Sequence, residues 1–211
     1  MKDDGSIVDI ENPEAGGPYA GDMIRYSPRR VDIPAGGSQT IRLAARRPKD
    51  LPNGEYLSHL VLKQIPNKTI PSDTDNNTDD SNKQLNLAVQ PVLKIAIPVI
   101  VRKGTSNTIA EISDILPITK EGLVEEVHFT LHRQGEFSLS GNVELFELNE
   151  EEPGPRVGFI RGIALYATSL KRLVRIRFNE AIKSSGKTYL LRFSDDEKYG
   201  GSSIVEKKIS F

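Results

Sequence analysis

Four oxygen-bearing side chains alternate along one polar segment of the chain: Asp73, Asp75, Asn77 and Asp79. They match the first ligand positions of a calcium-binding loop. Such a loop also needs a glycine at its sharp turn and a bidentate glutamate at its end, and Thr78 and Gln84 occupy those positions. Because residues 67–83 are also poor in apolar side chains, we predict a mobile, solvated loop there and no metal site.

The remaining residue types give no catalytic centre. His128 and His132 are four residues apart, which on a strand separates them by about 13 Å, too far for one zinc ion. The chain has no cysteine, which excludes disulfides, thiol catalysis and thiolate metal sites. No serine stands in a Gly-x-Ser-x-Gly motif, and no glycine-rich phosphate loop follows a strand. We therefore expect a protein that is not an enzyme and that holds no cofactor.

The basic residues form small groups rather than one large positive surface. Arg175 and Arg177 alternate with apolar residues, so they share one face of a strand, which we interpret as solvated and balanced by nearby acids. The chain has 28 Lys and Arg against 29 Asp and Glu, a net charge of −1. This balance argues against nucleic acid or anionic lipid as a partner. No apolar run reaches the roughly 18 residues of a membrane span.

The elements that must position any binding residue are strands. From Ile24 onward, apolar and polar residues alternate in short stretches, which is typical of half-buried β-strands and predicts an all-β protein. A length of 211 residues suits two domains, which we place at residues 1–104 and 105–211. The second part shows about seven strand signals with turns between them, the number expected of an immunoglobulin-like β-sandwich.

The longest strand signal runs from Gln84 to Arg102. Its odd positions are almost all aliphatic: Leu85, Leu87, Val89, Leu93, Ile95, Ile97, Val99 and Val101. Pro91 and Pro98 cannot donate to a β-ladder, so this strand should lie at a sheet edge for part of its length. An edge strand with an apolar face is a surface on which another strand can pair.

Three motifs in the first half resemble periplasmic pilus (fimbrial) chaperones. A proline-containing extended segment, a Pro-x-Gly turn and a Gln-x-x-Arg-Leu strand occur in that family in the order found here: Tyr26-Ser27-Pro28, Pro34-Ala35-Gly36 and Gln39-Thr40-Ile41-Arg42-Leu43. The strand ending in Ile65-Pro66 and the long strand ending in Val99-Ile100-Val101-Arg102 are similar to the two strands that follow in the family. The resemblance covers about residues 20–105 closely and the second half loosely.

The resemblance implies two immunoglobulin-like sandwiches, a periplasmic location and donor-strand complementation. In that mechanism the chaperone supplies its long strand to a pilus subunit whose own sandwich lacks a strand. By the family's pattern the inserting row would be Leu85, Leu87, Val89, Pro91, Leu93 and Ile95. The partners would be pilus subunits, together with an outer-membrane usher. The alternative for the same edge is a structural or adhesive β-sandwich protein that self-associates by strand exchange.

Two departures from the family modify this expectation. The family's first three strands have no counterpart, so the first sandwich keeps about four strands. Apolar side chains such as Leu43 and Leu62 should then be partly uncovered, and we expect a strand-swapped homodimer. The family clamps the subunit's terminal carboxylate with a lysine four residues before the arginine of the last strand. Pro98 stands at that position here, so we expect a different anchor.

Overall fold

The computed structural model describes residues 1–8, 10, 17–66, 91–105, 107–150, 152–183, 186–195 and 204–211. Its regular structure in these ranges is β-strand apart from one short 3-10 turn at Gly21–Met23, so the all-β prediction is confirmed. No helix among them has the length and apolar character needed to cross a membrane. The chain divides into two compact units, Met1–Ser58 with Ile100–Phe211, and His59–Val99. A domain boundary after residue 104 stays a prediction.

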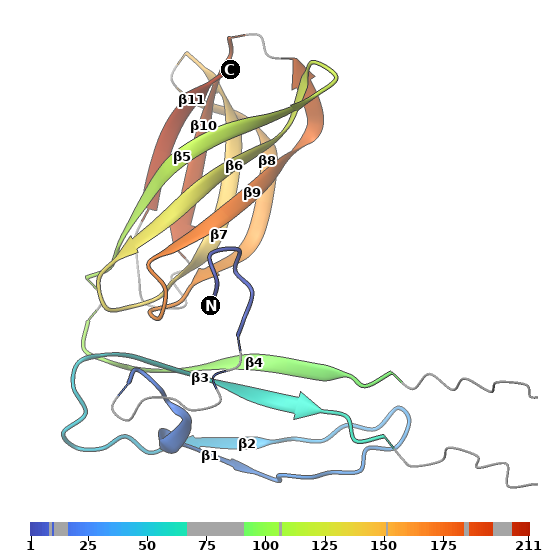
Figure 1. Ribbon diagram of the computed structural model, residues 1–211, viewed down its shortest axis with the longest axis vertical. Helices are drawn as coiled ribbons and strands as arrows, with labels where there is room; N and C mark the ends of the chain where they lie inside the picture. The colour runs from blue at the N-terminus through green and yellow to red at the C-terminus, as the bar shows by residue number, and fades with distance from the viewer. Residues whose placement is uncertain are drawn as a thin grey trace, which may run out of the picture. The chain divides into compact units, whose positions relative to one another are not determined.

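Seven strands of the larger unit form a β-sandwich: β5 (Ile109–Lys120), β6 (Leu123–Gln134), β7 (Leu139–Asn149), β8 (Glu152–Leu165), β9 (Lys171–Lys183), β10 (Thr188–Asp195) and β11 (Ile204–Ser210). In one layer β6 pairs with β5 and β9, and in the other β7 pairs with β8 and β10, while β11 follows β10. All these pairs are antiparallel (Figure 1). The assignment of this sandwich to the immunoglobulin-like class stays a prediction.

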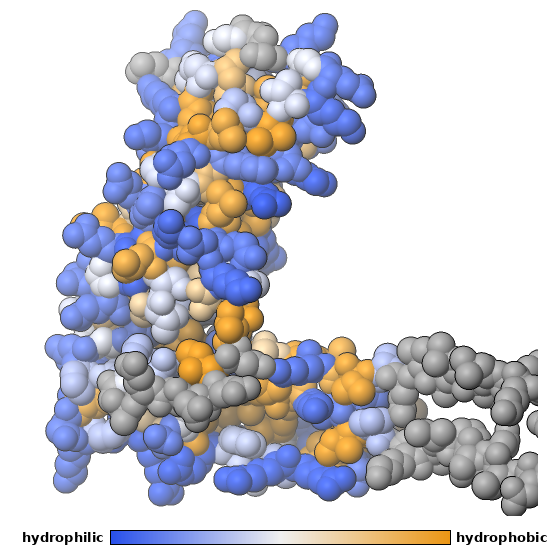
Figure 2. All heavy atoms as spheres, viewed as in Figure 1, coloured by the Kyte–Doolittle hydropathy of each residue, from blue (hydrophilic) through white to orange (hydrophobic). Residues whose placement is uncertain are grey.

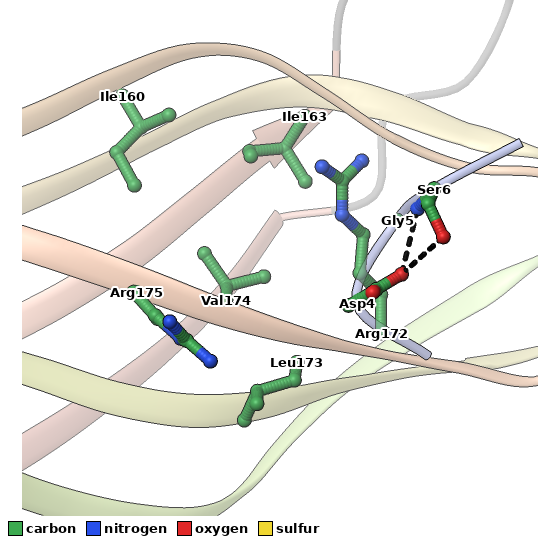
Figure 3. Close-up of a pocket in the computed structure, with 9 residues that line it drawn as sticks. All are labelled: Asp4, Gly5, Ser6, Ile160, Ile163, Arg172, Leu173, Val174 and Arg175. Atoms are coloured by element: carbon green, nitrogen blue, oxygen red, sulfur yellow. Dashed lines mark hydrogen bonds between the residues drawn. The ribbon is translucent and has the colours of Figure 1, made fainter. Parts of the chain in front are cut away.

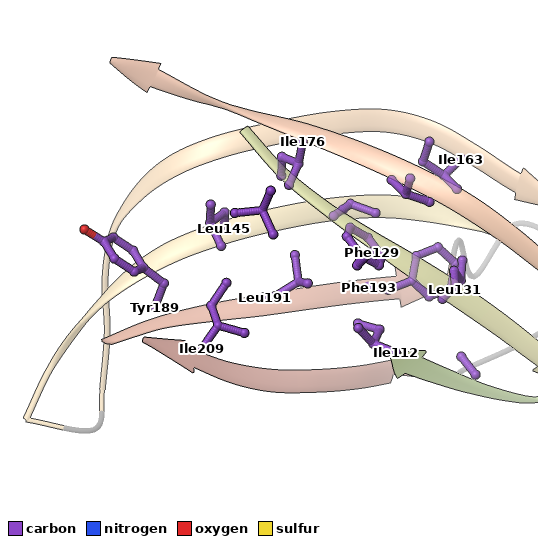
Figure 4. Close-up of a cluster of buried hydrophobic side chains, with 14 of the residues drawn as sticks. Ile112, Phe129, Leu131, Leu145, Ile163, Ile176, Tyr189, Leu191, Phe193 and Ile209 are labelled. Atoms are coloured by element: carbon purple, nitrogen blue, oxygen red, sulfur yellow. The ribbon is translucent and has the colours of Figure 1, made fainter. Parts of the chain in front are cut away.

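The alternation in the sequence explains the core between the two layers. On β6 the side chains of Val127, Phe129 and Leu131 are buried, and the residues between them are partly exposed (Figure 4). Removing a Phe or Leu side chain from water contributes about 1.5 to 3 kcal/mol. At one end of the core the ring of Tyr189 stacks on that of Phe211, with 5.1 Å between centroids. Apolar burial therefore holds the two layers together.

The two layers meet through β8 and β9 at a single bridge, where Gly158 lies opposite Phe178. A side chain does not fit at Gly158, because a Cβ there would lie 2.7 Å from the carbonyl oxygen of Arg177. Among the described residues, the ladder between β8 and β9 does not continue past this bridge. A seam therefore separates the later part of β8 from the beginning of β9.

We expect Gly158→Ala to destabilise the sandwich by about 1 to 3 kcal/mol, because the added methyl group must push two backbones apart. Urea unfolding followed by far-UV circular dichroism measures this loss. Gly21→Ala is the control, since its added Cβ would lie 3.7 Å from the nearest atom, Ser58 Oγ. Equal unfolding midpoints for the two variants would contradict the close-approach argument.

Four shorter elements make two further sheets. The strands β1 (Ile24–Ser27) and β2 (Arg42–Ala45) pair antiparallel, and β3 (Gly54–Lys63) pairs with β4 (Lys94–Lys103). The motif from Gln39 to Leu43 predicted that β2 includes Gln39, but β2 starts at Arg42, opposite Ser27. Pro28 follows Ser27 and has no N–H to extend the ladder, which explains the later start.

Candidate partner-binding site

The described part of the predicted binding strand is β4. We predicted a strand from Gln84 to Arg102, of which residues 84–90 lie outside the described residues. Within residues 91–105 the strand spans Lys94–Lys103, after Pro91, which cannot donate a hydrogen bond to a ladder, and the exposed Leu93. Leu93 is still tied to the end of β3, since its carbonyl accepts from the Gln64 N–H at 2.9 Å and its N–H donates to Gln64 Oε1 at 3.3 Å.

Three of the predicted binding residues are described, and all three are exposed: Pro91, Leu93 and Ile95. Leu93 exposes 61% of its surface and Ile95 44%. The other predicted residues, Leu85, Leu87 and Val89, lie outside the described residues, as do the predicted mobile loop and the calcium-like positions within it. The described half of the predicted apolar row is therefore accessible to a partner.

Exposure falls along β4 toward its C-terminal end. Ile97 exposes 44%, Val99 is half-buried and Val101 exposes only 6%. Val101 belongs to a small buried cluster with Met23 and Leu51. The end of β4 at Val101 is thus packed into the protein, while its beginning presents aliphatic side chains to solvent. Figure 2 shows hydrophobic side chains at the surface where β3 and β4 lie.

In the part of the chain that the structure describes, one edge of β4 has a strand beside it and the other has none. In the described ranges the sheet that contains β4 has two strands, and the second is β3. The opposite edge of β4 therefore has no neighbouring strand there. An aliphatic row next to an unpaired edge is the combination that accepts an added strand, because the edge offers main-chain hydrogen bonds and the row offers apolar contacts.

A buried carboxylate fixes the beginning of β3 and the end of β4. The side chain of Glu55 is 0% exposed and accepts a hydrogen bond from Arg102 Nε at 2.9 Å. It also accepts from the Ser138 N–H at 3.0 Å and from the Ser138 hydroxyl. Bonds to an ionised group are about twice as strong as neutral ones. Glu55 therefore joins the beginning of β3 and the end of β4 to Ser138, the residue before β7.

A second buried charge, Arg133 at the end of β6, is 5% exposed. Its guanidinium donates to four backbone carbonyls, those of Gly135, Phe137, Ala167 and Ser169. Burial lowers the pKa of Arg133, and the nearby Glu55 carboxylate opposes that shift. Arg133 thus organises the segments that follow β6 and β8.

Of the residues first considered for chemistry, His128 and His132 are described, and each has its own partner. No three metal-binding side chains gather in the described part of the chain. His132 Nε2 lies 2.7 Å from Ser113 Oγ, and His128 Nε2 lies 2.9 Å from a carboxylate oxygen of Glu126. The two histidines therefore have different partners, as their spacing on a strand predicts.

The basic face of β9 is balanced by an acid. Arg175 and Arg177 are both exposed, and Arg177 Nε donates to Glu126 Oε1 at 2.7 Å. Hydrogen bonds from His128 and Arg177 lower the pKa of the Glu126 carboxyl. Such a group adds stability above its unfolded pKa and loses that contribution as the pH falls through its folded pKa.

We expect Arg177→Gln to raise the pKa of Glu126 toward its usual value, because one of the two donors is removed. Carbon-13 NMR titration of the Glu126 carboxyl measures this change. The free energy of unfolding at pH 7 should change little, since solvent screens an exposed pair. Arg175→Gln, on the same face, should leave the Glu126 titration in place. A Glu126 titration that is identical in wild type and Arg177→Gln would contradict the assignment.

Comparison with protein-family models, with curated proteins and with solved structures finds no match to this chain. The family relationship suggested by the motifs between Tyr26 and Arg102 therefore rests on those residues alone.

Proposed function

We propose that this protein is a chaperone that binds pilus-type subunits by adding its β4 strand to their incomplete sandwich. The observation that carries the proposal is the exposed aliphatic row of β4, with Leu93, Ile95 and Ile97 between 44% and 61% exposed, beside an edge with no neighbouring strand in the described ranges. A soluble protein gains nothing from such a row unless a partner covers it.

The energetics favour a partner that needs a strand over a partner with a flat apolar surface. Burying the exposed half of each of these three side chains contributes on the order of 1 kcal/mol. Association costs about 4 to 15 kcal/mol, so apolar contact alone is too weak. Main-chain hydrogen bonds of about 0.5 to 1.5 kcal/mol each must supply much of the rest. A protein with an open strand position provides them.

The finer parts of the proposal rest on the resemblance to pilus chaperones. The motifs from Tyr26 to Leu43 and the Ile65-Pro66 pair support a pilus subunit as the partner, an outer-membrane usher as a further partner and the periplasm as the location. Pro98 is exposed in β4 and carries no charge to clamp a terminal carboxylate. The proposed complex therefore relies on strand addition more than on an ionic anchor.

We expect Ile95→Asp to abolish capture of a pilus subunit, because it places a charge within the apolar row. Co-expression in the periplasm followed by co-purification measures capture, and we expect at least a hundredfold loss of bound subunit. Ala96→Asp is the matched control, because successive side chains of a strand point to opposite faces. The control should retain the subunit. Equal capture by wild type and Ile95→Asp would overturn the proposal.

Self-association is the second candidate, and the β1–β2 pair favours it. Tyr26 exposes 42% and Leu43, opposite it in the ladder, exposes 49%. Two-stranded sheets are marginal in water without further cover. A strand-swapped homodimer would provide that cover for the structural or adhesive alternative. Sedimentation velocity measures it: a concentration-dependent dimer that Ile95→Asp disrupts supports this candidate, and a monomer at every concentration contradicts it.

A further inference from the structure

One strand of the sandwich carries a positive charge in its inward-facing row. Val174, Ile176 and Phe178 of β9 are buried, and the residues between them are exposed. Arg172 has the same phase as this buried row, so its side chain is directed inward rather than to the solvated face. It lies where β9 begins, in the seam that opens beyond the Gly158 bridge.

The guanidinium of Arg172 is only partly satisfied. Its Nη1 donates to the carbonyl oxygen of Ala164 on β8 at 2.6 Å. Its Nε is buried and has no hydrogen-bond partner among the residues that the structure describes. Gly5 covers the group so closely that a Cβ there would lie 2.6 Å from Arg172 Cζ. A buried donor without an acceptor costs about 1 to 3 kcal/mol, so the chain satisfies this guanidinium incompletely.

Asp4, an acid that lines the same pocket as Arg172, is already committed to a local turn. One carboxylate oxygen of Asp4 accepts from the Ser6 N–H at 2.8 Å and from the Ser6 hydroxyl at 2.7 Å. These two bonds lower the pKa of Asp4. Burial lowers the pKa of Arg172, with Tyr166 and Asp4 opposing that shift at a distance. Asp4 therefore contributes charge near the seam without filling the position beside Nε.

A pocket of about 590 Å³ lies in the same seam (Figure 3). Its walls include the aliphatic side chains of Ile160 and Ile163 from β8 and of Val174 from β9, and Asp4, Gly5 and Ser6 form another part. Figure 3 shows the guanidinium of Arg172 between Ile163 and the Asp4–Ser6 turn. The volume lies within the range of about 300 to 1,000 Å³ that is usual for small-molecule sites.

We propose that this pocket binds a carboxylate carried on an aliphatic chain. The carboxylate pairs with the guanidinium of Arg172, which lines the pocket, and a guanidinium forms strong charge-assisted bonds to carboxylates. The aliphatic chain covers Ile160, Ile163 and Val174. An inorganic anion would leave this apolar wall in water, and an uncharged aliphatic molecule would provide no counter-charge for the guanidinium of Arg172. Charge and apolar lining together therefore select an aliphatic carboxylate.

Isothermal titration calorimetry of the full chain with sodium decanoate tests the proposal. We expect one equivalent to bind, and we expect Arg172→Gln to weaken the affinity at least tenfold. Arg172→Lys keeps the charge but not the planar donor group, so its affinity for decanoate should lie between those of wild type and Arg172→Gln. Arg177→Gln is the control, because it removes a positive charge from the same strand outside the pocket lining, and its affinity should stay within twofold of wild type.

Decanol provides the ligand control, since it has the same chain without the charge, and it should bind at least tenfold more weakly than decanoate. If Arg172→Gln does not fold, the amide shifts of Leu173 and Val174 in wild-type NMR spectra, with decanoate and with decanol, replace the variant. No binding of decanoate, equal binding of decanol, or full affinity in a folded Arg172→Gln would overturn the proposal. The outcome does not depend on β4 or on any pilus subunit.

Discussion

Replacing Glu55 with alanine should lower the free energy of unfolding by about 3 to 5 kcal/mol, the range for breaking one partner out of a buried ion pair. The substitution leaves the guanidinium of Arg102 without its carboxylate. It also leaves the N–H and hydroxyl of Ser138 without the acceptor they share. Because the Glu55 side chain is 0% exposed, water does not replace these bonds without rearrangement.

Urea unfolding followed by circular dichroism measures the loss in free energy of unfolding. Two further variants show how much of it comes from the charge and from burial. Glu55→Gln keeps an oxygen acceptor but removes the charge, so its loss should be smaller than that of Glu55→Ala. Glu206→Gln is the matched control, because Glu206 pairs with Arg192 at 2.6 Å with 43% of its own side chain exposed. Exposed pairs contribute about 0 to 1 kcal/mol. Similar losses for Glu55→Ala and Glu206→Gln would contradict the buried-network interpretation.

Replacing Arg133 with methionine should cost a comparable amount, about 3 to 5 kcal/mol. Methionine fills much of the space but donates no hydrogen bond, so four carbonyls lose a donor. Each acceptor that stays buried and unsatisfied costs about 1 to 3 kcal/mol, and those that water reaches cost less. Urea unfolding again measures the loss.

Two other substitutions separate the role of geometry at Arg133 from that of charge. Arg133→Lys keeps the charge but has fewer donors and no planar fork, so its loss should be intermediate. Arg192→Met removes an arginine of the same sandwich whose Nε has an exposed partner, and it should cost less than about 1 kcal/mol. A loss below 1 kcal/mol for Arg133→Met would show that the four carbonyls do not need this donor.

The sequence predicts the strands well because period-two alternation and burial have the same physical origin. Phe129 and Leu131 alternate with polar residues because only one face of β6 meets the core. The strand beginnings are less predictable, because they depend on local hydrogen bonds. β2 starts at Arg42 because Pro28, which follows the partner residue Ser27, ends the available ladder.

The exposed row of β4 could be predicted because it is a local pattern, whereas the buried charges could not. Glu55 is 83 residues from Ser138 in the chain, and its burial depends on that distant partner. A weaker signal was nevertheless present in the sequence. Each of these charged residues lies two positions from a buried apolar residue of its strand, and so on the same face. The pairs are Glu55 and Leu57, Arg133 and Leu131, and Arg172 and Val174. A charged residue on the buried face of a strand therefore indicates a position where the folded protein must provide an ionic or hydrogen-bond partner.

Exposure falls along β4, so the residues that stabilise the fold and the residues that face solvent lie at different ends of the strand. Val101, at 6% exposure, contributes to the protein's own folding, whereas Leu93, at 61%, contributes little. Under the proposed strand addition, substitutions near Leu93 would change which polypeptide is accepted without lowering the yield of folded protein. Natural selection would then vary recognition at one end of the strand while the other end keeps the fold constant.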